Sequence, residues 1–334
     1  MEQYIITIDG GTTNTRCILW DSRQNKVGEE VREVGVRNTA IDGNNSRLKQ
    51  AVKECLDRLV EARGITWDMV YRIIASGMIT SDVGIVEVPH LTCPAGIEEL
   101  REAMVSILLP EICQKPICFI SGIKNFGEEI TLENFESMDI MRGEEVESVA
   151  VIERYHTGKP MLLILPGSHN KFVAVDENKR ITGCLTSISG ELLASITKDT
   201  IIAKSVGKEF LDYEDYDREW LLAGYENAKK TGLGRACFSG RILYLFKDKR
   251  VEKIQNYILG AALAGDMTAI LNSSAVKADR GTMAVVCGKN PLRQAMLDIF
   301  EYENLFAEVK SFVPEKGMSA SAIGAYLIAK ESHG

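Results

Sequence analysis

Two short segments of the chain place small, hydroxyl-bearing and polar residues directly after an apolar run. They are residues 9–14 (DGGTTN) and residues 166–171 (PGSHNK). Glycines let a backbone approach a ligand closely, and successive backbone N–H groups with hydroxyl and amide side chains can face phosphate oxygens. A tight hairpin turn without a ligand uses similar residues. The recurrence of the pattern favours two loops that grip one polyphosphate from opposite sides.

Individual side chains in these loops suit phosphate and its metal. Asp9 stands at the mouth of the first loop, where a carboxylate could hold Mg²⁺, a cation that keeps most of its waters. In the second loop Lys171 could place a point charge on a phosphate, and His169 could donate to it. Lys171 would equally suit a solvated loop. A metal role for His169 has no second ligand to support it.

A third segment, residues 141–145 (MRGEE), precedes an expected helix. One of its glutamates could accept the proton of a substrate hydroxyl, and Arg142 could form a bidentate pair with a substrate carboxylate. The helix dipole alone also favours carboxylates at this position, and Arg142 could instead pair with a neighbouring glutamate. Both interpretations remain open from the residues.

Two further segments mix small, polar and proline residues at the end of a strand, where α/β proteins bind ligands, and two others are short turns. Residues 76–81 (SGMITS) and 86–95 (VEVPHLTCPA) are compatible with a substrate site and with ordinary loops. Residues 287–290 (CGKN) form a strand-to-helix turn that could carry a nucleotide base. Residues 189–192 (SGEL) could be a capped helix start.

The elements that position these segments form an internal repeat. Residues 4–27 return in similar form as residues 161–182, each an apolar run, a small-residue turn, a second apolar run and a polar turn. Gly11-Thr12 lines up with Gly167-Ser168, and Asn14 with Asn170. Two β-loop-β hairpins of one design predict a duplicated scaffold.

The rest of the chain alternates strands and helices, which predicts α/β layers with mixed sheets. Ser46 is a plausible N-cap and Gly64 follows the end of the same helix. The expected strands are 4–8, 16–20, 27–34, 70–75, 116–120, the hairpin 161–183, 282–287 and 305–310. The expected helices are 46–63, 97–108, 144–155, 190–203, an inserted helical segment at 211–246, 251–273, 291–302 and 319–330.

Length and composition narrow the class of protein. The 334 residues suit two domains, which the repeat divides into 1–150 and 151–334. A net charge of −8 without a basic tract argues against nucleic acid as a partner, and no long apolar stretch predicts a membrane span. The eight cysteines include no CxxC pair, and no signal peptide is evident, so we expect reduced thiols in a cytoplasmic protein.

Taken together, the motifs resemble those of the 2-dehydro-3-deoxygalactonokinases. These motifs are IDGGTTN at 8–14, SGM at 76–78, VEVPHLTCPAG at 86–96, IMRGEE at 140–145, LPGSHNKFV at 165–173 and SGEL at 189–192. The resemblance implies the actin/hexokinase-like fold, with two RNase H-like domains of mixed sheets flanked by helices and an active-site cleft between them. The first domain would carry the sugar-acid site and the second the adenosine site.

The resemblance also implies an activity, the Mg²⁺- and ATP-dependent phosphorylation of the C6 hydroxyl of 2-dehydro-3-deoxy-D-galactonate. Asp9 would serve the metal, and Glu144 would be the base, with Glu145 as second choice. The nucleotide would contact Gly11, Thr12, Thr13, Asn14, Gly167, Ser168, His169, Lys171 and Gly288. The sugar acid would contact Ser76, Met78, Arg142, Glu145 and Glu191. A homodimer is compatible with the sequence.

The chain departs from the usual family pattern in three places. Gly10 stands where the family usually has tryptophan, Phe172 follows the lysine of the second loop, and Ser189 replaces a threonine. The change at position 10 is expected to alter the wall of the sugar pocket. A kinase for another sugar, a nucleotide or sugar sensor without turnover, and a phosphohydrolase are the alternatives.

Overall fold

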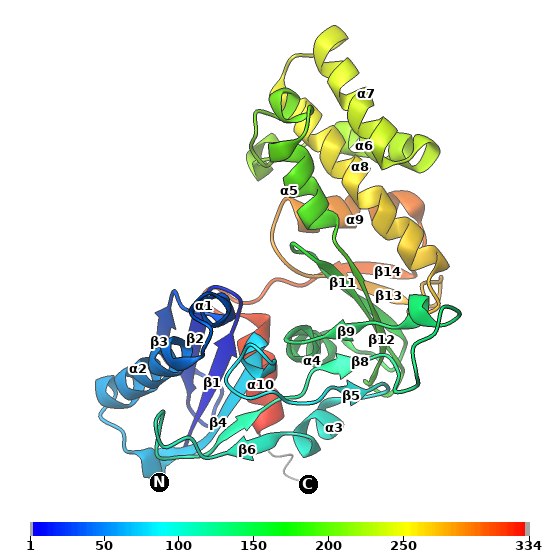
Figure 1. Ribbon diagram of the computed structural model, residues 1–334. Coiled ribbons are helices and arrows are strands. Elements are labelled where there is room, and N and C mark those ends of the chain that lie inside the picture. The colour runs from blue at the N-terminus through cyan, green and yellow to red at the C-terminus, as the bar shows by residue number, and fades with distance from the viewer. Residues whose placement is uncertain (1–2, 331–334) are drawn as a thin grey trace.

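The computed structural model describes residues 3–330 and contains two large mixed sheets and one small sheet (Figure 1). The N-terminal sheet has the order β3-β2-β1-β4-β7-β6. Its strands are β1 (Tyr4–Gly10), β2 (Thr15–Trp20), β3 (Lys26–Arg32), β4 (Val70–Gly77), β6 (Val105–Ile107) and β7 (Ile117–Phe119). The first three form an antiparallel meander, and β4 runs parallel to β1.

The C-terminal sheet repeats this arrangement with the order β12-β11-β10-β13-β14. Its strands are β10 (Met161–Leu165), β11 (Asn170–Val175), β12 (Ile181–Ser187), β13 (Met283–Val286) and β14 (Glu308–Ser311). Again an antiparallel meander of three strands is followed by a parallel neighbour of the first strand. The predicted duplication of the hairpins is therefore confirmed.

A third sheet joins the two halves. It consists of β5 (Leu91–Thr92), β8 (Ile123–Lys124) and β9 (Ile140–Met141). The side chain of Asn125, which follows β8, bonds the backbone N–H and carbonyl of Cys184 in β12. Ala95 also forms a β-bridge with Ile181 at the start of β12. The small sheet is therefore anchored to the edge of the C-terminal sheet.

The helices cover both faces of the two large sheets (Figure 1). Apolar side chains of α4 and α10 share one core cluster with inward residues of both sheets, so these two helices lie between the sheets. None of the helices within residues 3–330 combines the length and apolar character that a membrane crossing needs. The helices are α1 (Val36–Asp42), α2 (Ser46–Ala62), α3 (Ile97–Glu102), α4 (Glu144–Tyr155), α5 (Ser189–Asp199), α6 (Arg218–Thr231), α7 (Leu233–Phe246), α8 (Val251–Asn272), α9 (Leu292–Glu303) and α10 (Ala320–Ala329).

The structure corrects two sequence predictions. The helix expected at 97–108 ends at Glu102, because the β-branched residues of Val105–Ile107 pair with β7 as an edge strand. Ser46 is the first residue of α2 rather than its cap, since Asn45 holds the cap position. In addition, α10 returns from the C-terminal half to pack on β1, β4 and α4.

Candidate active site

The first loop connects β1 to β2 and projects from the end of the N-terminal sheet. The backbone N–H of Gly11 donates to the carbonyl of Asn14 at 2.9 Å, which closes a tight turn. The start of α1 holds this turn from outside, because Val36 and Arg37 donate their N–H groups to the carbonyls of Gly11 and Thr12. The side chains of residues 12–14 remain exposed and free to meet a ligand.

Asp9 lies beside the predicted segment 76–81 because β1 and β4 are parallel and in register. Asp9 pairs with Ser76, and Gly10 pairs with Gly77. The carboxylate of Asp9 accepts a 2.7 Å hydrogen bond from the hydroxyl of Ser321, at the start of α10. Burial raises the pKa of Asp9, while Ser321 and the charge of Arg16 oppose that rise.

Two glycines bring the start of α4 against this pair of strands. Gly77 has a φ of 84°, and a Cβ there would lie 3.3 Å from the Oδ1 atom of Asp9. Gly143 has a φ of 110°, and its Cβ would lie 3.3 Å from the Cα atom of Gly77. Both glycines thus combine a left-handed conformation with a close approach that side chains disfavour. The predicted segments 76–81 and 141–145 therefore meet beside Asp9.

The two glutamates at the start of α4 differ in accessibility. Glu144 is partly exposed, and its Oε2 atom accepts from the backbone N–H of Arg142 at 3.0 Å. Glu145 is only 1% exposed, and its Oε2 atom accepts from the N–H of Gly143 at 2.7 Å. Burial and the neighbouring charge of Glu144 raise the pKa of Glu145 to about 8. Glu145 is therefore mostly protonated at neutral pH.

Glu147 is an acidic neighbour of Asp9 that sequence reasoning missed. Burial raises its pKa to about 8, and the charges of Asp9 and Glu144 add to this rise. The spacing offered a signal, because residues three apart on a helix share a face and Glu147 follows Glu144 by three. Asp9, Glu144 and Glu147 form one electrostatically coupled group of carboxyls.

Arg142 joins the two predicted substrate segments through its guanidinium group. One terminal nitrogen donates to both the carbonyl and the hydroxyl of Thr80 at 2.7 Å. The other donates to the carbonyl of Val88 at 2.8 Å and lies 3.3 Å from both ring nitrogens of His90. Its contact with a substrate carboxylate stays a prediction, because most of these donors already serve the protein.

His90 and Ser76 lie in the two predicted substrate segments. Burial, and then the nearby charges of Arg142 and Lys124, lower the pKa of His90, which favours its neutral form. Ser76 is buried, whereas Met78 is partly exposed at the end of β4. Their contacts with a sugar acid stay predictions.

The second loop, between β10 and β11, is held on two sides. The N–H of Glu191 donates to the carbonyl of Ser168 at 3.0 Å, and a Cβ on Gly190 would lie 2.1 Å from the carbonyl oxygen of Gly167. On the other side Gly288, with a φ of 82°, would place a Cβ 3.2 Å from the carbonyl oxygen of Pro166. The structure thus brings Gly167, Ser168, Gly190 and Gly288 together.

Two side chains of the second loop have partners that the sequence did not reveal. His169 lies 3.0 Å from the carboxylate of Glu191, and both side chains are exposed. Glu191 therefore lies with the second loop, and its contact with a sugar acid stays a prediction. Lys171 is 5% exposed, so the interpretation as a solvated loop residue is wrong.

The ammonium of Lys171 is bonded both to β9 of the small sheet and to β12 of the C-terminal sheet. It donates to the carbonyl of Ile140 at 2.7 Å and to the hydroxyl of Thr186, and lies 3.7 Å from the carboxylate of Asp139. A contact between Lys171 and a phosphate stays a prediction, and it would require some of these bonds to break.

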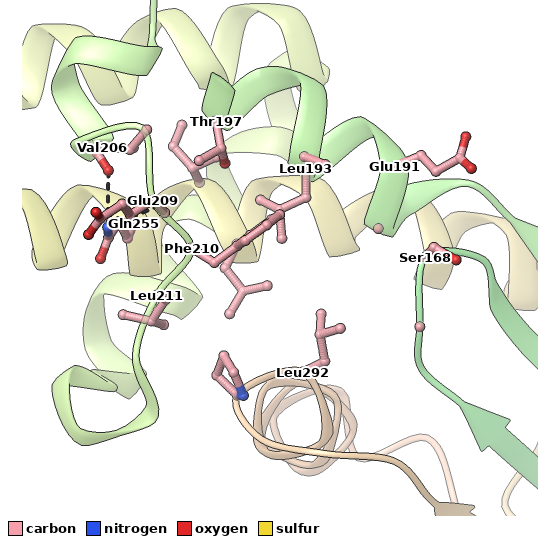
Figure 2. A pocket seen from close by; sticks show the side chains of 16 residues that line it. Ser168, Glu191, Leu193, Thr197, Val206, Glu209, Phe210, Leu211, Gln255 and Leu292 are labelled. Atoms are coloured by element: carbon pink, nitrogen blue, oxygen red, sulfur yellow. Dashed lines mark hydrogen bonds between the residues drawn. The ribbon is translucent and has the colours of Figure 1, made fainter. Parts of the chain in front are cut away.

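A cavity of about 380 Å³ opens beside the second loop (Figure 2). Gly167 and Ser168 form one edge of it, and α5, α8, the start of α9 and residues 206–211 form its walls. The lining is mostly apolar, with Leu193, Phe210 and Leu292 prominent in Figure 2. At one end the amide of Gln255 donates to the carbonyls of Val206 and Glu209. Such a lining suits a flat, largely apolar ligand group.

Residues of the first loop do not line this cavity, and α4 provides the link between the two. Asp9 does not line the 380 Å³ cavity. However, Glu147 couples to Asp9 on one side and contributes to the raised pKa of Cys287 on the other, after burial. Cys287 precedes Gly288, which packs on the second loop. Glu147 of α4 therefore lies within electrostatic range both of Asp9 at the first loop and of Cys287 beside the second loop.

The carboxyl groups near the first loop limit the kind of metal site that is possible. Among residues 3–330, no three His, Cys, Asp or Glu side chains lie close enough together to form a metal-binding cluster. A hydrated Mg²⁺ needs only one or two protein carboxylates when phosphates supply further ligands. Asp9, partly exposed at the mouth of the loop, fits that requirement.

Comparisons with known proteins agree with this arrangement. A family model for 2-keto-3-deoxy-galactonokinase matches residues 9–318. The chain belongs to this family. The 2-dehydro-3-deoxygalactonokinase of Escherichia coli K12 is 21% identical over 271 residues, which cover 79% of this chain and 80% of the relative. The family makes the chain a phosphotransferase that acts on a sugar-acid hydroxyl.

A solved structure supports the fold of this kinase. The crystal structure of a candidate 2-dehydro-3-deoxygalactonokinase from Sinorhizobium meliloti matches with a TM-score of 0.76 at 19% identity. The match covers 97% of this chain and 98% of the other. The predicted fold class is therefore confirmed, with two related α/β halves and mixed sheets.

Proposed function

We propose that this kinase transfers the γ-phosphoryl group of ATP to the C6 hydroxyl of 2-dehydro-3-deoxy-D-galactonate. The observation that carries the proposal is the placement of α4. Helix α4 lies between the two sheets whose hairpins carry the loops, and its Glu147 interacts electrostatically with Asp9 at the first loop and with Cys287 beside the second. The family and its Escherichia coli relative support the choice of acceptor.

Glu144 is the proposed general base. Glu145 is buried and bonded to its own turn, so it cannot reach an acceptor. Glu144 is partly exposed and anchored through one oxygen only. In the transfer the acceptor oxygen attacks the γ-phosphorus, its proton passes to Glu144, and the bond to the β–γ bridging oxygen breaks to release ADP.

Asp9 would hold Mg²⁺, whose charge offsets that of the phosphates when it is bound. The hydrogen bond from Ser321 fixes the orientation of the Asp9 carboxylate. The exposed loop that follows Asp9 presents the hydroxyls of Thr12 and Thr13 and the amide of Asn14 toward incoming phosphate oxygens. Catalysis in this account rests mainly on positioning and charge neutralisation.

The cavity beside the second loop is the proposed nucleoside site. Its volume of about 380 Å³ is within the range of small-ligand pockets, and its apolar walls suit the faces of an adenine ring. Gly167 and Ser168 at its edge would receive the phosphates, and Gly288 keeps the neighbouring turn close to them. Closure of the two halves would bring these phosphates toward Glu144 and exclude water.

The acceptor is proposed to lie on the N-terminal side, beside residues 76–78 and the start of α4. Arg142, with Lys124 near His90, gives this region the positive charge that a carboxylate substrate requires. The remaining donor capacity of Arg142 is the contact proposed for that carboxylate. A neutral sugar of similar size, which has no carboxylate, should therefore be a poor acceptor.

An acceptor panel tests the proposal. Release of ADP and of inorganic phosphate should be measured in parallel with ATP, Mg²⁺ and each of several sugar acids and neutral sugars. The proposal expects ADP release that depends on 2-dehydro-3-deoxygalactonate and produces no free phosphate. Tight ATP binding without any product would identify a sensor, and phosphate release without an acceptor would identify a phosphohydrolase.

A further inference from the structure

A buried carboxylate outside the reacting groups lies directly behind the second loop. Asp266, in the second half of α8, is fully buried. No cation within residues 3–330 forms an ion pair with it; instead three side chains donate to its carboxylate. They are the hydroxyl of Ser189 at 2.5 Å, the amide of Asn170 at 2.7 Å and the hydroxyl of Ser187.

These three donors belong to the segments that shape the second loop. Asn170 is the last residue of the loop and the first of β11, and it is the register partner of Ser187 at the end of β12. Ser189 begins α5. Asn170 also accepts, through its Oδ1 atom, the N–H of Gly167 at 3.0 Å. One chain of hydrogen bonds therefore runs from Asp266 through Asn170 to Gly167.

This series of hydrogen bonds requires a hydrogen-bond acceptor at position 266. The Asn170 amide group can give its oxygen to Gly167 only if its nitrogen points the other way, toward an acceptor. Asp266 supplies that acceptor and so fixes which way the Asn170 side chain is turned. The surrounding α8 residues Leu263, Met267 and Ile270 are buried and apolar, so packing alone would favour an apolar residue here.

We propose that Asp266 is a positioning residue, which holds the Pro166–Asn170 loop in the conformation that receives the nucleotide phosphates. It touches neither substrate, and it acts through Asn170. The inference rests on the proposed function, because it assigns the phosphates of ATP to this loop. Loss of Asp266 should weaken nucleotide binding while it leaves the acceptor site on the other half of the chain intact.

The variants follow from the hydrogen bonds. In Asp266→Asn the amide oxygen can still accept from Asn170, and the amide nitrogen can donate to the two serine hydroxyls, so this variant should keep the loop. Asp266→Leu removes the acceptor at similar volume. Asn170→Ala leaves Asp266 with both serine donors and breaks only the link to Gly167. Asp298→Leu is the control, since Asp298 is a buried carboxylate of the same half that accepts from Tyr216 and Gln294.

The experiment measures ADP binding by calorimetry, KM for ATP and for the acceptor, and thermal unfolding of each variant of the full chain. We expect Asp266→Leu and Asn170→Ala to weaken ADP binding and to raise KM for ATP by about tenfold or more. KM for the acceptor should stay within about twofold, and Asp266→Asn should remain close to the parent. Asp298→Leu should lower the unfolding temperature without changing ADP affinity.

Two results would overturn the inference. One is parent-like ADP binding in Asn170→Ala, a test that holds even if Asp266→Leu does not fold. The other is a loss of affinity in Asp298→Leu equal to that in Asp266→Leu, which would make the effect one of general stability. Failure of the proposed function looks different, because the parent protein would then bind ADP but form no phosphorylated product.

Discussion

The ammonium group of Lys171 donates a 2.7 Å hydrogen bond to the backbone carbonyl of Ile140. Lys171 directly follows the second loop, and Ile140 lies in β9, the strand that leads into Glu144. Asp139 reinforces the contact by accepting the N–H and hydroxyl of Thr186 in β12. The proposed phosphate loop and the proposed base are thus tied to each other through one buried lysine.

This contact predicts that Lys171→Met reduces turnover more than nucleotide binding. Because the proposed base would lose its fixed distance from the phosphate loop, kcat should fall by about tenfold to a hundredfold. KM for ATP should change by less than about threefold if Lys171 acts only through Ile140. Steady-state kinetics with both substrates varied measures the two effects. A large rise in KM for ATP would instead restore the phosphate contact predicted from the sequence.

Stability provides the control for the lysine variant. Removing Lys171 takes away the cation 3.7 Å from the Asp139 carboxylate, while the N–H and hydroxyl of Thr186 still donate to it. The loss of stability should therefore stay below about 3–5 kcal/mol, the cost of an uncompensated buried charge. The double variant Lys171→Met with Asp139→Asn should recover part of this loss, while its kcat remains low. Urea denaturation separates the two contributions.

Gly10 predicts a different kind of defect. A Cβ at this position would lie 2.5 Å from the Cβ atom of Ile79, in the segment that follows Gly77. Gly10→Ala should therefore destabilise the protein by about 1–3 kcal/mol through overpacking. Ile79→Ala keeps the Cβ atom that lies closest, so only Ile79→Gly should remove the 2.5 Å contact. The double variant Gly10→Ala with Ile79→Gly should then show the loss of a buried side chain without the overpacking. Equal stability of the parent protein and Gly10→Ala would contradict the close packing of Gly10 against Ile79. The tryptophan usual in the family at this position is thus incompatible with the present packing of Ile79.

The raised pKa of Glu145 predicts a pH dependence of stability. Its pKa of about 8 in the folded protein exceeds the value near 4.5 of an ordinary glutamate, so the folded state binds the proton more tightly. The contribution of this protonated carboxyl group to the free energy of unfolding is fully present below pH about 4.5, and it is lost as the pH rises through about 8. Glu145→Gln keeps an oxygen for the N–H of Gly143 and cannot ionise.

Denaturation midpoints at a series of pH values between about 5 and 8 test this linkage. The parent protein should lose more stability across the series than Glu145→Gln does. Glu147, which carries a similar shift, remains in both proteins, so the difference isolates Glu145. Parallel curves for the two proteins would show that Glu145 is ionised in the folded state at neutral pH.

The cavity beside the second loop predicts where the nucleoside can be blocked. Ala194 of α5 lines the cavity, whereas its neighbour Ser195 is exposed and does not. Ala194→Trp should fill the space, raise KM for ATP and weaken ADP binding by about tenfold or more. Ser195→Trp should leave both values near those of the parent. Similar values for both tryptophan variants would place the nucleoside elsewhere.

The sequence predicted the parts of this molecule that depend on neighbours along the chain. The two meanders were recognisable because the first two strands of each are largely apolar and the same small-residue turn follows both β1 and β10. The glutamates at the start of α4 were recognisable because they follow a glycine before a helical pattern. Residues 105–107 were misassigned, since a short segment with β-branched residues fits the end of a helix and an edge strand equally well.

The parts that could not be predicted depend on contacts between distant segments. The small sheet has strands of only two residues each, which leave no periodic pattern. Because β9 could not be predicted, nothing in the sequence indicated that Lys171 contacts Ile140. Asp266 lies 96 residues from Asn170, in a helix whose other buried residues are mostly apolar, and its role appears only once α8 is packed behind the loop.

Direct detection of the phosphorylated sugar acid is the measurement that tests the account most closely. Phosphorus NMR should follow ATP and 2-dehydro-3-deoxygalactonate with the parent protein, Glu144→Gln and Asp9→Asn, with ADP binding measured beside it. The account predicts a C6 phosphate ester with the parent, and about a hundredfold to ten-thousandfold slower formation with Glu144→Gln at unchanged ADP affinity. Ester formation by Glu144→Gln at the rate of the parent would contradict the proposed base. The absence of ester from the parent across the acceptor panel would contradict the proposed reaction.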